Sequence, residues 1–227
     1  MEELFYTLFS QLPGTDSGMQ VALFSLSALL SVVACALLAH RNDLGWWAQI
    51  LAVFAGPLVI SMQYDTLFLV YAIPALLIGV FGLWRFSRYK FHGKFTRQVL
   101  RAPLGLSAII AAVLGVAVLT ALHLGEMLTT GFAFTAGTGT IWVSYLTEAV
   151  VLVSFALIAC GIRAGWLLMA LASAVYVATL FANNPAFALL LVWVFMVIAS
   201  LYAWFMWRAL PRRDSADHAV GTPAVAD

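Results

Sequence analysis

Long apolar runs are separated by gaps, and only every second gap carries basic residues. Of all the features of the sequence, this pattern most narrows the folds that the chain can adopt. In multi-pass membrane proteins, Lys and Arg concentrate in the loops on the cytoplasmic side. The pattern therefore predicts seven crossings, with the amino terminus outside and the carboxyl terminus in the cytoplasm. All eleven basic residues fit this topology: Arg41, Arg85, Arg88, Lys90, Lys94, Arg97, Arg101, Arg163, Arg208, Arg212 and Arg213.

The composition indicates that lipid, rather than water, surrounds the chain. Apolar residues make up 64% of the 227 residues and charged residues only 9%, whereas a soluble domain carries about 25% charged residues. So few charges do not cover a water-facing surface, and we expect a membrane protein with the bilayer as its partner. The basic residues are explained by topology, so no nucleic-acid partner is expected.

Each apolar run has the length of a membrane-spanning helix. A helix needs about 20 apolar residues to cross the hydrocarbon core, and its backbone polar groups must be satisfied within the segment. The chain is therefore predicted to be an all-α membrane protein. The predicted spans are 19–40, 45–62, 66–86, 103–123, 138–160, 164–184 and 186–207.

The chain also resembles itself when it is shifted by 120 residues. Among rare residue types, Gly45-Trp46 falls on Gly165-Trp166, and Trp84 falls on Trp204. A single extra helix between two triplets gives both triplets the same orientation, as in parallel repeats related by an axis along the membrane normal. Transporters built from repeats bind substrate between them.

This repeat sets the predicted domain organisation. Residues 1–18 are expected to form an interfacial segment, and residues 208–227 a disordered cytoplasmic tail. Between them lie a first three-helix repeat at 19–86, a basic cytoplasmic connection with a linker helix at 87–123, and a second three-helix repeat at 138–207.

Glu148 is the carboxylate that lies well inside a predicted crossing. A charged group at that depth is costly, and such groups usually face a cavity or a partner. Trp142, Tyr145 and Glu148 are spaced by three and lie along one stripe of the helix. One interpretation is a ligand-binding carboxylate flanked by rings. The alternative is a structural hydrogen bond to Thr147, Ser154 or a neighbouring helix.

Further candidate binding residues lie on the second helix of each repeat, on the last helix and in the turn between the last two helices. They are Gln49, Trp46, Trp166, Ser173, Tyr176, Trp193, Asn183 and Asn184. For Trp46 and Trp166, near helix ends, the alternative is the aromatic belt of the membrane interface. A cavity with rings, amides, hydroxyls and one carboxylate suits a flat, neutral or weakly cationic heteroaromatic ligand.

Other functional classes are not supported by the sequence. A retinal protein needs a Lys in its last span, but Lys90 and Lys94 lie in a loop. No HExxH, GxSxG or P-loop pattern occurs, and the four His residues are scattered, so no enzyme activity, metal site or cofactor is predicted. Cys35 and Cys160 lie in apolar runs and are expected to be buried, inert thiols.

From about residue 19 to residue 208 the chain resembles the PnuC family of vitamin transporters. The similarity lies in the three-one-three arrangement and in two stretches, Gly45-Trp46 through Gly82-Leu83-Trp84-Arg85, and Thr147-Glu148-Ala149 through Gly165-Trp166 to Leu201-Tyr202-Ala203-Trp204. The resemblance implies a fold similar to the SWEET sugar transporters and a multi-pass protein of the bacterial cytoplasmic membrane. It also implies uptake of nicotinamide riboside, thiamine or riboflavin by facilitated diffusion, with cytoplasmic phosphorylation as the trap.

Three departures from the nicotinamide riboside members bear on the substrate. The third helix ends in Gly82-Leu83-Trp84-Arg85-Phe86, Ser173 stands where Asn or Asp is common, and Glu148 stands where Asp is common. They favour the riboflavin branch, RibM- or PnuX-like, with nicotinamide riboside or thiamine as the alternative. A proton-coupled symporter that uses Glu148 is the alternative mechanism. The sequence does not predict the oligomeric state.

Overall fold

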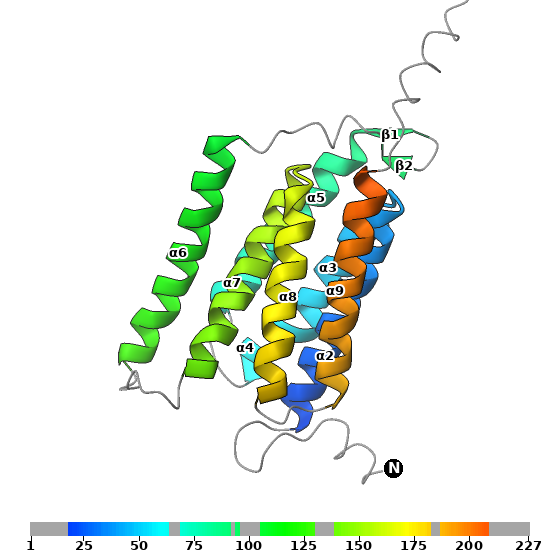
Figure 1. Cartoon of the computed structure of the whole chain (residues 1–227). Helices are drawn as coiled ribbons and strands as arrows, with labels where there is room; N and C mark the ends of the chain where they lie inside the picture. The colour runs from blue at the N-terminus through cyan, green and yellow to red at the C-terminus, as the bar shows by residue number, and fades with distance from the viewer. Residues whose placement is uncertain are drawn as a thin grey trace, which may run out of the picture.

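A computed structural model describes residues 18–63, 69–91, 94–95, 105–129, 139–182 and 187–208. The described residues form seven helical segments (Figure 1). These are α2 (Gly18–Ala39), a continuous segment made of α3 (Leu44–Val53), the π-helical turn η1 (Phe54–Leu58) and α4 (Val59–Gln63), then α5 (Leu69–Ser87), α6 (Leu106–Thr129), α7 (Gly139–Ala159), α8 (Ala164–Ala182) and α9 (Phe187–Arg208). Strands β1 (Lys90–Phe91) and β2 (Lys94–Phe95) pair antiparallel.

The chain is an all-α, multi-pass membrane protein. Four helical stretches are long and apolar enough to cross a membrane by themselves: Val21–Ala39, Leu69–Ser87, Ala164–Phe181 and Phe187–Arg208. The helix ends lie within a few residues of the predicted ones, except that the predicted span 103–123 corresponds to an α6 that continues to Thr129. Residues 1–17 and 209–227, which hold nearly all of the predicted interfacial segment and tail, lie outside the described residues.

Six of the helical segments form a closed ring. Neighbouring contacts run from α2 to α3, then to α5, α7, α8 and α9, and α9 returns to α2. Helix α6 stands outside this ring, at the left edge of Figure 1, and contacts α7 and, more weakly, α5. The ring therefore encloses a space between its two halves, α2–α5 and α7–α9.

Two glycines at matching positions let neighbouring helices of the ring come close. A Cβ on Gly45 would lie 2.7 Å from the carbonyl oxygen of Ala34 on α2. A Cβ on Gly165, 120 residues later, would lie 2.8 Å from the carbonyl oxygen of Ser154 on α7. Small residues at such contacts allow backbones to approach within a membrane, which explains why Gly precedes Trp in both places.

The π-helical turn η1 lies where Pro57 interrupts the second helical segment. Proline has no N–H to donate, so the regular helical hydrogen-bond ladder is broken there. Ser27 on α2 compensates, because its hydroxyl donates to the carbonyl oxygen of Ala52 at 2.8 Å. Gly56 allows this contact, since a Cβ there would lie 2.7 Å from Ser27 Oγ. Turns of this kind are frequent at functional sites.

All Lys and Arg residues in the described part of the chain lie at one end of the ring, which we call the basic end. This end holds the last turns of α2, α5, α7 and α9 together with β1 and β2, at the top of Figure 1. Two hydrogen bonds join helices there: Trp207 Nε1 donates to the carbonyl oxygen of Leu38 at 3.0 Å, and Arg85 Nη1 donates to that of Ala159 at 2.9 Å. The described basic residues are Arg41, Arg85, Arg88, Lys90, Lys94, Arg163 and Arg208.

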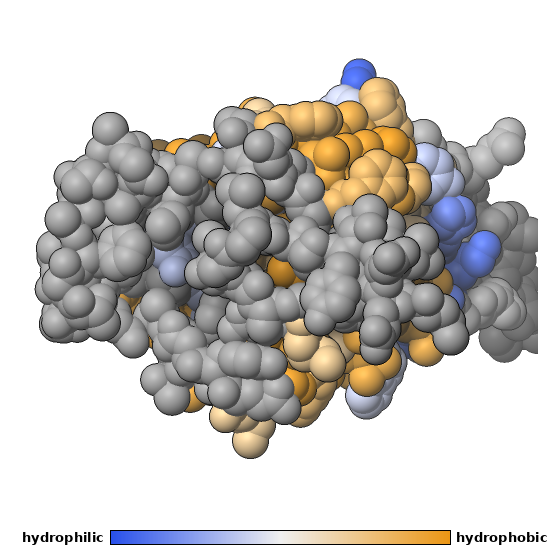
Figure 2. Space-filling view, turned by 90° about the horizontal axis from the view of Figure 1, so that it is seen from below, coloured by the Kyte–Doolittle hydropathy of each residue, from blue (hydrophilic) through white to orange (hydrophobic). Residues whose placement is uncertain are grey.

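Seen from below, the coloured surface is mostly hydrophobic, and most of the hydrophilic residues in view lie at the right edge (Figure 2).

The two cysteines differ in their exposure. Cys35 on α2 is buried, as predicted. Cys160, which was also expected to be buried, is exposed, because it lies in the turn that follows α7 rather than in the helix.

Candidate binding pocket

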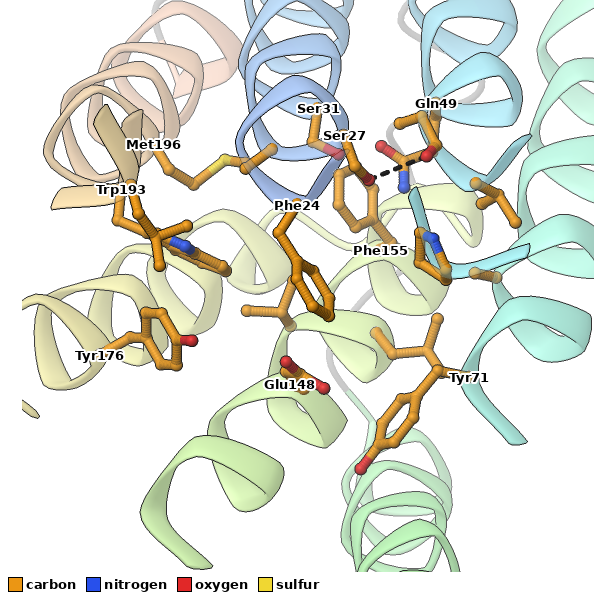
Figure 3. A pocket seen from close by; sticks show the side chains of 18 of the residues that line it. Phe24, Ser27, Ser31, Gln49, Tyr71, Glu148, Phe155, Tyr176, Trp193 and Met196 are labelled. Carbon is orange, nitrogen blue, oxygen red and sulfur yellow. Dashed lines mark hydrogen bonds between the residues drawn. The ribbon is translucent and has the colours of Figure 1, made fainter. Parts of the chain in front are cut away.

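A pocket of about 200 Å³ lies inside the ring. Its lining residues come from α2, α3, η1, α5, α7, α8 and α9, so both halves of the ring contribute (Figure 3). Pockets with an apolar lining and a few convergent polar groups are the usual form of small-molecule sites. The polar groups of this pocket decide which molecule it suits.

Glu148 on α7 points into this pocket, toward the space between Phe24, Tyr176 and Tyr71 (Figure 3). None of the described residues that line the pocket is Lys, Arg or His. A carboxylate at this depth therefore has no basic side chain beside it in the lining. Such a group favours a cation or a hydrogen-bond donor on the ligand.

The alternative role predicted for Glu148 is a structural hydrogen bond to Thr147, Ser154 or a neighbouring helix, and among the described residues the hydroxyls of Thr147 and Ser154 donate elsewhere. Thr147 Oγ1 donates to the carbonyl oxygen of Val143 at 2.6 Å, and Ser154 Oγ donates to that of Val150 at 2.7 Å. A hydroxyl has a single hydrogen to donate, so both are committed to the backbone of their own helix. This leaves the Glu148 carboxylate for the pocket.

Aromatic rings form one side of the pocket. The rings of Tyr176 on α8 and Trp193 on α9 lie 4.6 Å apart at an interplanar angle of 48°. Phe24 from α2 and Phe155 from α7 add two further rings (Figure 3). Flat ligands are held on such surfaces by offset stacking or edge contacts.

A polar edge lies on the side of α2 and α3. Gln49 is 7% exposed, and its Oε1 has no hydrogen-bond partner among the described residues. Ser27 and Ser31, four residues apart on α2, line the pocket nearby (Figure 3). A buried acceptor without a partner costs about 1–3 kcal/mol, so a ligand that donates a hydrogen bond to Gln49 would remove that cost.

Four of the predicted binding residues meet in this pocket: Gln49, Glu148, Tyr176 and Trp193. Tyr145 presents its carbonyl oxygen to the hydroxyl of Tyr71, which donates at 3.2 Å, and is not among the lining residues. Ser173 is fully buried and does not line the pocket either. The side chain of Trp142, and both Asn183 and Asn184, lie outside the described residues.

Trp46 and Trp166 lie elsewhere, packed with three other aromatic side chains toward the basic end. Both are 0% exposed, so they form neither the lipid-facing belt nor the pocket wall. The sequence placed them near helix ends but did not show which way they face. We call this group the aromatic cluster; its members are Trp46, Phe86, Phe95, Trp166 and Trp207.

Several pocket residues were not found from the sequence. The pair Ser27 and Ser31 carried a usable signal, since two hydroxyls four residues apart on an apolar helix share a face. The others are apolar or aromatic residues of types that recur throughout the chain, and nothing in the sequence distinguishes them. They include Phe24, Tyr71, Phe155 and Met196.

Comparison with known proteins identifies a solved structure with a similar fold. No protein-family model matches the chain, and a search of curated proteins found no significant match. Among solved structures, the chain is similar to one described as the vitamin B3 transporter PnuC, with a TM-score of 0.58 and 16% sequence identity. The similarity covers 85% of this chain and 83% of the other. The two chains therefore share a fold over most of their length.

Proposed function

We propose that this chain is a PnuC-family transporter that carries a flat heteroaromatic vitamin across the bacterial cytoplasmic membrane. The observation that carries the proposal is the position of Glu148, a carboxylate in an aromatic pocket inside the six-helix ring, with no basic side chain among the described residues that line this pocket. A pocket inside a ring of membrane-spanning helices suits a transported ligand, because substrate sites of repeat transporters lie between the repeats, near the middle of the membrane. The shared fold with a vitamin B3 transporter supports the same conclusion.

The proposal includes parallel three-helix repeats joined by α6, with the basic end in the cytoplasm. The closed ring supports this arrangement, because each predicted triplet supplies three consecutive neighbours and α6 lies outside. The matching close approaches at Gly45 and Gly165 support it as well. The gathering of Lys and Arg at one end supports the orientation, since basic loops stay on the cytoplasmic side.

The pocket bears on which vitamin is carried. Two of the departures that favoured riboflavin do not touch it: Ser173 is buried outside the lining, and residues 82–86 lie at the basic end. The third is Glu148, whose carboxylate favours a positively charged ring among aromatic side chains. Nicotinamide riboside and thiamine carry such a ring, and riboflavin does not. We therefore place the two cationic vitamins before riboflavin, with nicotinamide riboside first because of the fold shared with a vitamin B3 transporter. Riboflavin is supported by the aromatic lining alone.

Facilitated diffusion is the proposed mechanism, with phosphorylation in the cytoplasm as the trap. The second candidate is proton symport, which the carboxylate in the pocket would support by carrying the proton. Uptake into proteoliposomes with and without a proton gradient separates the two. Uptake that stops at equal concentrations in both conditions agrees with facilitated diffusion, whereas gradient-dependent accumulation without phosphorylation indicates symport.

Direct binding measurements test the substrate. The purified full-length protein is titrated by calorimetry with nicotinamide riboside, thiamine and riboflavin in turn. We expect the cationic vitamins to bind more tightly than riboflavin. Tighter binding of riboflavin, visible also as a yellow preparation, would reverse the order proposed here, and folded protein that binds none of the three would refute the vitamin-transporter proposal.

A further inference from the structure

The pocket ends, on the side of the basic end, at a continuous layer of buried side chains. Phe155 and Met196 line the pocket and also belong to the buried core that contains the aromatic cluster (Figure 3). The core continues from them to Trp207 and Phe95 at the basic end. Any molecule that leaves the pocket toward the basic end has to pass this layer.

The rings of the aromatic cluster interlock across the two halves of the ring of helices. Phe86 on α5 contacts Trp46 on α3 at a centroid distance of 5.2 Å, and Trp166 on α8 contacts Trp207 on α9 at 5.2 Å. Phe95 contacts both sides, with centroid distances of 4.7 Å to Phe86 and 6.1 Å to Trp207. Phe86 and Trp207 also contact each other across the halves, at a centroid distance of 6.3 Å, and Phe95 packs on both rings and so completes the layer there.

Phe95 differs from the other described members of this core because it lies on a strand and not on a helix. It is nevertheless 0% exposed. Apart from its pairing with Lys90 in the two-stranded ladder, its main chain is joined to the helices by Arg41, which follows α2. The Phe95 N–H donates to the Arg41 carbonyl oxygen at 3.0 Å, and Arg41 Nε donates to the Phe95 carbonyl oxygen at 2.7 Å. A residue on a short strand moves more easily than one on a packed helix.

Arg41 adopts a backbone conformation that is unusual for its residue type. Its φ is 65°, in the left-handed region that favours glycine. The equivalent position 120 residues later is Gly161, with φ 76°. The helix ends match as well, because the N–H groups of Arg41 and Gly161 donate to Leu38 and Ile158 in the same pattern. Arginine in place of glycine is explained here by its side-chain bond to Phe95.

Two indole N–H groups in the layer have no protein partner among the described residues, which fits a layer that also opens. Nε1 of Trp46 and Nε1 of Trp166 are buried and have no hydrogen-bond partner among the described residues. Buried donors without partners are rare in a core that is permanently closed. Opening of the layer would let both groups bind water or a passing ligand.

We propose that Phe95, held in place by Arg41, is the plug of a gate at the basic end of the pocket. The Phe95 ring leaves the aromatic cluster when the two hydrogen bonds between the Phe95 main chain and Arg41 break. The pocket then opens toward the basic end. This inference rests on the proposed transport function, since only a protein that moves a ligand needs such a gate.

Cys35 is a built-in reporter of the gate. Its side chain is 0% exposed, belongs to the same core as Phe95, and lies 3.7 Å from the sulfur of Met196 at the pocket wall. Replacing the exposed Cys160 by serine leaves Cys35 as the single thiol. The rate at which a small methanethiosulfonate reagent modifies Cys35 in the purified full-length protein then measures how often the layer opens.

Two variants weaken the plug in different ways. Phe95→Ala deletes the ring, whereas Arg41→Gly removes the side-chain bond to Phe95 and keeps the backbone conformation, because glycine accepts the φ of 65° without strain. Loss of one hydrogen bond from a charged donor is expected to raise the modification rate about tenfold. Phe205→Ala is the matched control, since this ring also lies near the basic end of α9 but is exposed.

Faster modification in both variants, with Phe205→Ala unchanged, supports the plug. The plug would be refuted if Cys35 is modified in Arg41→Gly and in Phe95→Ala at the same rate as in the Cys160→Ser protein that carries neither change. It would also be refuted if Phe205→Ala accelerates the modification equally, because that result indicates a general loosening of the fold. If Phe95→Ala does not fold, Arg41→Gly decides alone. The labelling needs no substrate, so its result is independent of whether any vitamin binds.

Discussion

Tyr176 on α8 and Trp193 on α9 place their rings 4.6 Å apart and form one wall of the pocket together. The contact joins two neighbouring helices of the second half of the ring. The two rings also fix each other's position, since removal of either one takes away a contact that holds the other at the pocket wall. Each has a polar atom, a hydroxyl or an indole N–H, with which it can orient a ligand as well as stack on it.

Replacing Trp193 by alanine is expected to weaken vitamin binding roughly tenfold, because one aromatic contact contributes about 0.5–1.5 kcal/mol beyond the area it buries. Calorimetry with the tightest-binding vitamin measures the change. Trp47→Ala is the control: Trp47 is 52% exposed and does not line the pocket. Equal losses in the two variants would mean that the wall formed by Tyr176 and Trp193 does not contact the ligand.

Replacing Glu148 by glutamine keeps its size but removes its charge. We expect affinity for a cationic vitamin to fall by about ten- to a hundredfold, since a hydrogen bond to a charged group contributes about 1.5–3 kcal/mol. Riboflavin, which is neutral, should be affected less. Glu148→Asp, which keeps the charge, should retain part of the binding. A similar loss for cationic and neutral ligands would contradict a role for the charge itself.

Much of the fold was predictable because the membrane imposes simple rules. Helix lengths followed from the thickness of the hydrocarbon core, so six of the seven spans were placed within a few residues. The end of α6 was missed by the prediction, which stopped at residue 123 because polar residues begin there, whereas the helix continues to Thr129. Hydropathy marks where apolar sequence ends, not where helical hydrogen bonding ends.

The site was predictable only where a residue is unusual for its depth. Glu148 and Gln49 stood out as polar groups in apolar helices, and both line the pocket. Trp46 and Trp166 stood out as well, yet they are buried in the aromatic cluster. A helix that is apolar on all sides gives no signal for which side faces a neighbour, so the direction of an indole ring depends on packing that the sequence does not show.

Replacing Gly82 by alanine is expected to destabilise the protein. A Cβ at this position would lie 2.5 Å from the Trp46 ring, so the indole has to move within a packed cluster. Such overpacking costs about 1–3 kcal/mol. The melting temperature in detergent measures the effect. Gly125→Ala on α6 is the matched control, since no atom lies within 4 Å of a Cβ there, and it should be neutral or slightly stabilising. Equal melting temperatures for both variants would show that the contact with Trp46 is loose.

Replacing Gln49 by leucine should change stability and binding in opposite directions. The variant removes a buried oxygen that has no partner among the described residues, and it should raise the free energy of unfolding by about 1–3 kcal/mol in the absence of ligand. The same change removes a group that the ligand would satisfy, so vitamin affinity should fall.

Ser173→Ala separates these two effects, because Ser173 Oγ is equally buried and unpartnered but does not line the pocket. This control should therefore gain stability and keep its affinity, although Ser173 was a predicted binding residue. Thermal unfolding with and without vitamin, combined with calorimetry, measures both quantities for each variant. A gain in stability with a loss of affinity in Gln49→Leu is the pattern expected where function keeps a stabilising substitution from being fixed. A Gln49→Leu protein that loses stability as well as affinity would show instead that the amide supports the fold and is not held in reserve for the ligand.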